Sequence, residues 1–126
     1  MTPVDLWKNA NLQYLGSVRK ALSEPMPDAE EALIGHIRNI EAHYARVGSL
    51  LAEANGLLDR GTYEFMSSEA AKKLGTVRER DIAAEGELSP VREIRDKIEA
   101  LLRAIELRVH LSQSILRQQR GERKLS

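Results

Sequence analysis

One long stretch of the sequence repeats its apolar residues with a coiled-coil rhythm, and this restricts the possible folds more than any other feature. Such a rhythm places the apolar side chains in one stripe along an α-helix, and nearly four heptads without a miss are typical of long helices packed in pairs. The stripe predicts a helix over about residues 28–60 that buries one face against a partner helix. Its members, at steps of four and three, are Leu33, Ile37, Ile40, Tyr44, Val47, Leu51, Ala54 and Leu58.

Capping and breaking residues predict three further helices. Thr2 as N-cap and Pro3 in the first position begin a helix over 3–22, which the two prolines of SEPMPD end. Gly61 fits a left-handed cap after the 28–60 helix, and GTYEFMSSEA then reads as a connector. A charged helix is predicted over 68–84, with a break at EGELSP.

The last predicted helix, over 90–119, opens at Ser89 and Pro90, a cap followed by a first-turn proline. It matches the 28–60 helix in length, since both are roughly 45–50 Å long at 1.5 Å per residue. We therefore predict a single all-α domain over residues 1–126. Its fold is an antiparallel, coiled-coil-like hairpin of two long helices with two shorter packing helices, three to four helices in total.

Composition and charge exclude several classes of protein. There is no cysteine, which excludes disulfides and thiolate metal sites. Equal numbers of basic and acidic residues, 19 of each, argue against a simple polycationic nucleic-acid binder. No apolar run approaches the roughly 18 residues of a membrane span, and MTPVDLWKNA lacks the order of a secretory signal. We expect a soluble protein of the cytoplasm.

A second stripe, made of small residues, follows the 28–60 helix about 140° around from the large apolar one. It contains Ala42, Ala45, Gly48, Ser49, Ala52 and Gly56. It is either a solvated face of good helix formers or a face against which another helix of this chain, or of a neighbouring chain, packs closely. A glycine inside a helix costs about 1 kcal/mol against alanine, and a solvated face gains nothing from it. The glycines therefore favour close packing, and we predict an assembly interface there.

No motif for catalysis or metal binding is present in the sequence. His36 and His43 are seven residues apart, roughly 10 Å along a helix, which is too far to share one metal ion. His110 has Glu106 one turn before it but no visible third ligand. There is no phosphate-binding glycine loop, no GxSxG and no HExxH. We predict no enzyme activity, no cofactor and no metal.

The chain ends in a small basic tail, residues 117–126, whose cations are Arg117, Arg120, Arg123 and Lys124. Cations at a helix C-terminus are favoured by the helix dipole, and they can also contact phosphates. Four cations on one chain would bind nucleic acid weakly, and a ring of subunits would multiply their number. Lys72 and Lys73 are candidates for a second basic strip.

The order of an N-terminal helix, a long heptad helix, the aromatic connector GTYEFM, a charged helix and the segment ELSPVREIRDKIEALLRAIELRVHLSQSILRQQR resembles UvsY-type phage recombination mediators. The similarity covers about residues 36–120, although this chain is neutral where a DNA-loading protein is expected to be basic. The resemblance implies a small helical protein that oligomerises, binds single-stranded DNA and helps to load a recombinase.

These observations favour a non-catalytic, homo-oligomeric helical accessory protein, with single-stranded DNA or a DNA-processing protein as partner. One alternative is a DNA-packaging adaptor of the phage small-terminase kind. The other is a protein-binding helical adaptor or inhibitor that does not contact nucleic acid.

Overall fold

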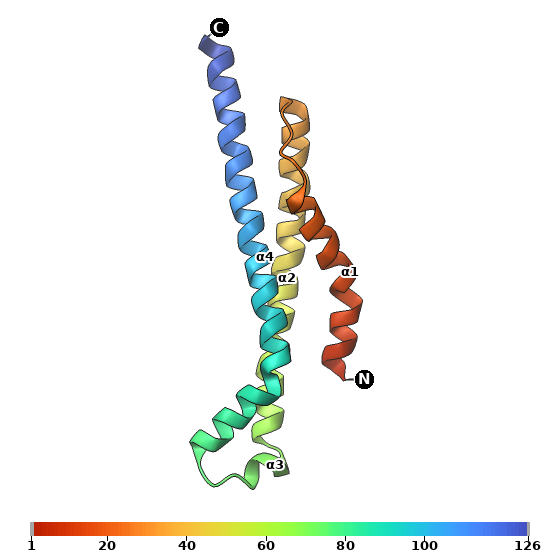
Figure 1. Cartoon of the computed structure of the whole chain (residues 1–126), viewed down its shortest axis with the longest axis vertical. Helices are drawn as coiled ribbons and strands as arrows, with labels where there is room; N and C mark the ends of the chain where they lie inside the picture. The colour runs from red at the N-terminus through yellow and green to blue at the C-terminus, as the bar shows by residue number, and fades with distance from the viewer. Residues whose placement is uncertain (1, 126) are drawn as a thin grey trace.

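The computed structural model describes residues 2–125, with side chains up to residue 122. Within that range the chain is all α-helical. Its elements are α1 (Pro3–Ser23), α2 (Glu30–Met66), α3 (Glu69–Lys72) and α4 (Val77–Leu125). α2 and α4 pack against each other as an antiparallel pair, and α1 lies along one side of that pair (Figure 1). The predicted all-α hairpin of long helices is confirmed.

Local sequence signals explain where α1 and α2 begin. The Thr2 hydroxyl accepts the Asp5 N–H at 3.1 Å, and the Asp5 carboxylate accepts the Thr2 N–H at 3.2 Å, a reciprocal capping box. These hydrogen bonds favour the ionised carboxylate and lower the pKa of Asp5. α2 starts at Glu30, two residues later than predicted, and Ala29 before it provides no side-chain cap.

The core follows the seam between α2 and α4. Five of the predicted seam residues are buried, namely Leu33, Ile37, Ile40, Val47 and Ala54, and they face the buried α4 residues Val91, Ile98 and Ile105. Leu51 and Leu58 are half-buried, whereas Tyr44 is 42% exposed on one flank. Leu50, outside the predicted stripe, is buried because the flank that carries it is covered by α1.

The predicted end of α2 at residue 60 is wrong. The helix continues to Met66, so that Tyr63 and Phe65 belong to its last turn instead of a connector. Gly61 is not a left-handed cap, because no glycine in the described residues has a positive φ. A Cβ at Gly61 would come within 2.6 Å of the Leu88 side chain. The glycine at this position therefore permits a close approach of α4 and ends no helix.

The predicted boundaries of the third and fourth helices are also wrong. Within the predicted 68–84 helix, Glu69–Lys72 forms the short helix α3, residues 73–76 turn the chain, and residues 77–84 belong to α4. Thr76 caps the start of α4 by accepting the Glu79 N–H at 3.1 Å, and α4 continues without a break through EGELSP. Pro90 is an interior residue of this helix and not its first turn.

α4 bends near Pro90, so that its first turns point away from the hairpin axis (Figure 1). Proline has no N–H, so the carbonyl of Gly86 lacks its intrahelical donor, and the ring displaces that carbonyl. The sequence indicates that Pro90 disturbs the helix, but the disturbance is a kink inside α4 and not the start of a helix. Leu88, just before the kink, is buried against Gly61.

Candidate interaction surfaces

One flank of the α2–α4 pair is covered by α1. The Trp7 indole N–H donates to the Glu53 carboxylate at 2.8 Å, and the Tyr14 hydroxyl lies 2.8 Å from His43 Nδ1. The Arg46 guanidinium stacks over the Tyr14 ring, 3.7 Å from its centroid, a cation–π contact. Burial raises the pKa of Tyr14, and the Arg46 charge acts in the opposite direction. These contacts fix α1 to the flank of α2 that carries residues 43, 46 and 53.

The end of α1 is held by Arg108, a half-buried arginine from α4. The Arg108 guanidinium donates to the carbonyl of Glu24 at 2.6 Å and to that of Leu22 at 3.4 Å. Its Nε–H donates to His36 Nε2 at 3.0 Å. The last carbonyls of a helix have no partner within the helix, and here Arg108 provides one. This arginine joins α1, α2 and α4 at one point.

Two polar residues of this junction, Arg108 and Ser112, interrupt the apolar positions of α4. Arg108 occupies a position next to the α4 seam, and Ser112 is 1% exposed inside the seam. The Ser112 hydroxyl donates to the Arg108 carbonyl at 2.7 Å and lies 3.2 Å from the sulfur of Met26. The sequence signal for the junction was present as these interruptions, but nothing in the sequence identified their partners in the loop.

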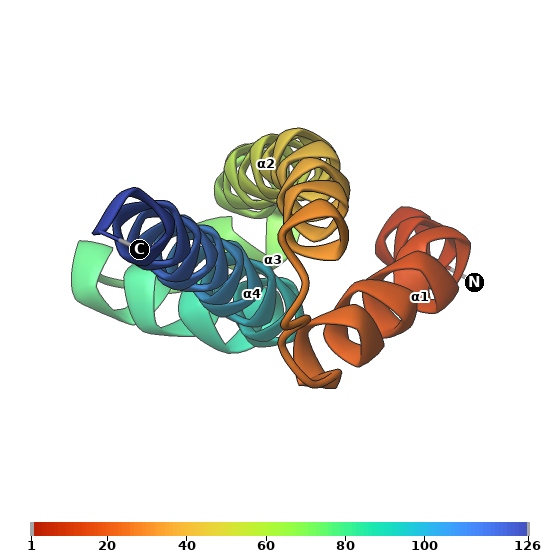
Figure 2. The ribbon, with the colours of Figure 1, turned by 90° about the horizontal axis from the view of Figure 1, so that it is seen from above.

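The opposite flank of the α2–α4 pair faces away from α1 (Figure 2). Two hydrogen bonds cross between the helices there: Tyr44 to Glu106 at 3.0 Å, and Arg95 to Asn55 at 3.4 Å. The Glu106 hydrogen bond and charge raise the pKa of Tyr44. A hollow beside Tyr44 is lined by Glu41, Tyr44, Glu106, Val109 and His110.

We call this flank the open face. It is defined by Tyr44, Gly48, Leu51 and Asn55 on α2 and by Arg95, Leu102, Glu106 and Val109 on α4. At 100° per residue, Ile40 and Val47 lie on the side of α2 that faces α4. The open-face positions of α2 lie to one side of this line, whereas His43 and Arg46, which contact α1, lie to the other side. Leu51, Leu102 and Val109 are half-buried, and Tyr44 is 42% exposed. The open face is therefore an apolar strip with a polar margin that no other helix of the described chain covers.

The predicted small-residue stripe lies on the outer side of α2. Ala42, Ala45, Ser49 and Ala52 are exposed, while Gly48 and Gly56 are half-buried. A Cβ at Gly48 or Gly56 would have no neighbouring atom within 4 Å. No helix of the same chain packs closely on the glycines, so the stripe is either a solvated face or, as predicted, a face for a neighbouring chain. Gly48 belongs to both the stripe and the open face, and Ala45 and Ala52 lie beside it.

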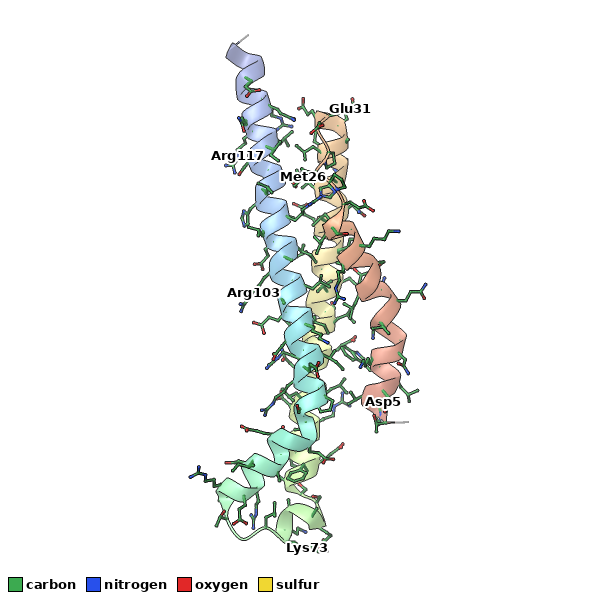
Figure 3. The ribbon with its side chains drawn as sticks, viewed as in Figure 1. Asp5, Met26, Glu31, Lys73, Arg103 and Arg117 are labelled. Atoms are coloured by element: carbon green, nitrogen blue, oxygen red, sulfur yellow. The ribbon has the colours of Figure 1, made fainter. Side chains whose placement is uncertain are left out.

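The predicted basic residues lie at opposite ends of the molecule. Lys73 is at one end and Arg117 is near the other (Figure 3). Lys72 pairs with Glu69 at 3.5 Å, and Arg120 pairs with Glu30 at the start of α2 at 3.2 Å. Arg117 is exposed, and among the described residues it donates to the Gln113 carbonyl of its own helix, at 3.5 Å.

Two further predicted cations, Arg123 and Lys124, have side chains outside the described residues. The six predicted cations therefore do not form one surface on a single chain. About 37 residues of α2 separate the two ends, roughly 55 Å of helix.

The histidines have structural partners or lie at the surface. His36 accepts from Arg108, and burial together with the Arg108 charge lowers the pKa of His36. His43 bonds to Tyr14, and His110 lines the hollow on the open face next to Glu106. Among the described residues no group of three or more His, Cys, Asp or Glu side chains is placed to hold a metal ion.

Comparisons with known proteins give no relative of this chain: no family model, no curated protein and no solved structure matches it. No helix in the described part is long and apolar enough to cross a membrane. Function must therefore be argued from the surfaces themselves.

Proposed function

We propose that this protein is a non-catalytic helical accessory protein that works as an assembly of identical chains. The observation that carries the proposal is the open face. A hairpin of two long helices has two flanks, and α1 covers only one of them. The other exposes Tyr44 and the half-buried residues Leu51, Leu102 and Val109. Helix pairs with such an apolar strip bury it against further helices in bundles.

The proposal is tested by the mass of the full chain in solution. Light scattering coupled to size-exclusion chromatography, from about 1 to about 100 μM, should give a multiple of the 14.1 kDa chain mass that grows with concentration. A monomer throughout this range would refute assembly and favour the alternative of an adaptor or inhibitor that binds a different protein.

A second candidate function is contact with single-stranded nucleic acid, of the kind that the resemblance to recombination mediators implies. One observation favours it. Arg120 pairs with Glu30 at the start of α2, and α4 continues beyond this level as a projecting helix end (Figure 1). Arg117 and Arg120 lie at the base of this projecting end. In an assembly several such ends would act together, which compensates for the few cations on each chain.

This second candidate is tested by titrating single- and double-stranded oligonucleotides at several salt concentrations. Arg117→Glu should abolish a steeply salt-dependent binding, whereas Lys73→Glu at the other end should leave it nearly unchanged. Tighter binding of the duplex would favour the DNA-packaging alternative. No binding at low salt would refute the nucleic-acid role and leave assembly itself unaffected. Either role places the protein in the cytoplasm of a bacterial or phage-infected cell.

A further inference from the structure

The charges on the open face are self-complementary when two copies of this face meet antiparallel. Arg95, Glu99, Arg103 and Glu106 alternate in sign along α4, and at 100° per residue they fall within an arc of about 80° on the side of Leu102. The Arg103 side chain is 75% exposed, Glu99 is 40% exposed, Glu106 is exposed and Arg95 is half-buried. Read from the other end, the same series has the opposite sign at each step. Two copies of this flank that meet antiparallel therefore place unlike charges together.

The register of such a pair follows from the charges. Arg95 would face Glu106 of the second copy, and Glu99 would face Arg103. The midpoint of Arg95 and Glu106 lies between Ala100 and Leu101, and the midpoint of Glu99 and Arg103 is at Leu101. A single two-fold axis at that level satisfies four contacts, because each pair occurs twice in a symmetric dimer. In a parallel arrangement of α4 against α4, each of these residues would face its own copy.

The same axis meets small residues on α2. The cross-helix bonds Tyr44–Glu106 and Asn55–Arg95 both join residues whose numbers add to 150, so the level of Ala100 and Leu101 on α4 corresponds to Ser49 and Leu50 on α2. Gly48 lies beside the axis on the open face, with open space where a Cβ would be. Two α2 helices can approach closely where small residues meet.

We propose that the open face binds a second copy of this chain in antiparallel register, α4 against α4 and α2 against α2, about a two-fold axis at the level of Ala100 and Leu101 on α4 and of Ser49 and Leu50 on α2. This inference rests on the proposed assembly function and specifies its interface. The product is a four-helix bundle in which every helix has antiparallel neighbours, the arrangement common in such bundles. The open face spans about 15 residues of α4, or about 22 Å, and two helices, or about 20 Å in width. It buries about 450 Å² per copy, or about 900 Å² in total, which is the size of weak, transient complexes and fits an assembly that grows with concentration.

Single-cysteine variants test the register, since the native chain has no cysteine to interfere. Two copies of residue 52 would have Cα atoms roughly 11 Å apart across the axis. Ala52→Cys should therefore form a covalent dimer with a short bismaleimide. Ala42→Cys is the matched control, because that exposed alanine lies on the other side of α2 and far from the axis; it should stay monomeric on a denaturing gel. A link between Ala52→Cys and Glu99→Cys in a mixture, without self-linking of Ala52→Cys, would overturn the proposal in favour of a parallel register.

Charge reversal tests the contacts themselves by sedimentation equilibrium of the full chain. Arg95→Glu should raise the dimer dissociation constant about tenfold, and the double variant Arg95→Glu/Glu106→Arg should bring it back to within about threefold of the native value. Lys97→Glu is the matched control on the flank covered by α1 and should change it less than about twofold. Circular dichroism confirms that each variant is folded.

The two proposals fail in different ways. A native chain that assembles, but shows neither the Ala52→Cys link nor rescue by the double variant, refutes this interface and leaves the assembly function standing. A native chain that stays monomeric at about 100 μM refutes the assembly function, and the interface with it.

Discussion

Arg108 should control the attachment of α1 to the hairpin, and its removal tests how this fold is held together. In Arg108→Ala the carbonyls of Leu22 and Glu24 and the ring of His36 lose their donor. A hydrogen bond to a charged group contributes about 1.5–3 kcal/mol. The contact to Leu22 at 3.4 Å is near the outer limit, and water can reach the Glu24 carbonyl, so the three bonds do not add fully. We expect a loss of about 2–3 kcal/mol, or roughly 10 °C in Tm for a chain of this size.

The assay uses the single tryptophan, which lies on α1 and packs against α2 through Glu53. Tryptophan fluorescence excited near 295 nm follows α1, whereas circular dichroism at 222 nm follows mainly the long helices. In urea, Arg108→Ala should shift the fluorescence transition to lower concentration by more than the circular dichroism transition, because α1 separates first. The fluorescence midpoint of Arg108→Lys should lie between those of the native chain and Arg108→Ala, since an ammonium group cannot reach both carbonyls and the histidine at once.

Arg103→Ala is the matched control for this prediction. Arg103 lies on the same helix, but its side chain is 75% exposed and, among the described residues, pairs with Glu99 one turn away. At about 1 μM, where the chain is monomeric and the interface between copies does not contribute, its removal should change the free energy of unfolding by less than about 0.5 kcal/mol. If the fluorescence and circular dichroism transitions of Arg108→Ala coincided, at the same urea midpoint as in Arg103→Ala, Arg108 would not hold α1. The packing of Trp7 and Tyr14 would then have to account for the attachment of α1.

Three further predictions follow from single positions. Since the folded-state pKa of His36 is lowered, the unfolded chain binds more protons as pH falls below about 6.5. Urea unfolding should therefore show stability that is full above that pH and declines below it, and His36→Gln should remove this part of the slope. Ile98→Ala, at a side chain 1% exposed, should cost about 2–5 kcal/mol in the same assay; a loss below about 1 kcal/mol would mean that the seam is not close-packed. Gly61→Leu should lower the Tm by several degrees because the added side chain collides with buried Leu88. An unchanged Tm would show that the first turns of α4, which carry Leu88, move away freely.

The fold class and the long helices could be predicted because their signals are periodic and local. The heptad series of α2 needs a partner helix, and the helix predicted over 90–119 matches it in length. Capping residues placed the start of α1 correctly, since Thr2 and Asp5 act within one turn of each other, and the two prolines after it placed its end to within one residue. These elements are determined by residues that lie close together in the sequence.

The boundaries between residues 60 and 90 could not be predicted, because the same residues act differently in a tertiary context. Gly61 is a common helix end by sequence, yet here it continues the helix so that Leu88 can pack against it. Pro90 after Ser89 resembles a helix start, but the preceding turns stay helical and the chain bends instead. In both cases a contact between distant residues decided what the local signal left open.

The open face was also beyond sequence reasoning. Tyr44 belongs to the heptad series, so the pattern placed it in the seam with Ile40 and Val47, yet in the structure it marks the uncovered flank at 42% exposure. Which flank stays open depends on the side that α1 takes, and that choice depends on contacts such as Trp7–Glu53 and Tyr14–His43 between distant residues. The small-residue stripe was recognised from the sequence, but its border with this flank was not.

Gly48 separates the two explanations that the sequence allowed for glycines inside α2. In a single chain a Cβ at Gly48 meets nothing within 4 Å, so Gly48→Ala should stabilise the monomer by about 1 kcal/mol through helix propensity alone. In the antiparallel dimer the same Cβ enters the interface near the axis, twice, and should raise the dissociation constant severalfold. Gly35→Ala is the matched control: it also has open space, but it lies on another side of α2, so it should stabilise the monomer and leave dimerisation unchanged. Unfolding at about 1 μM and sedimentation at higher concentration measure the two effects separately. If Gly48→Ala behaved like Gly35→Ala in both, the glycine would have no role in close packing, and the α2 helices would not meet at this level.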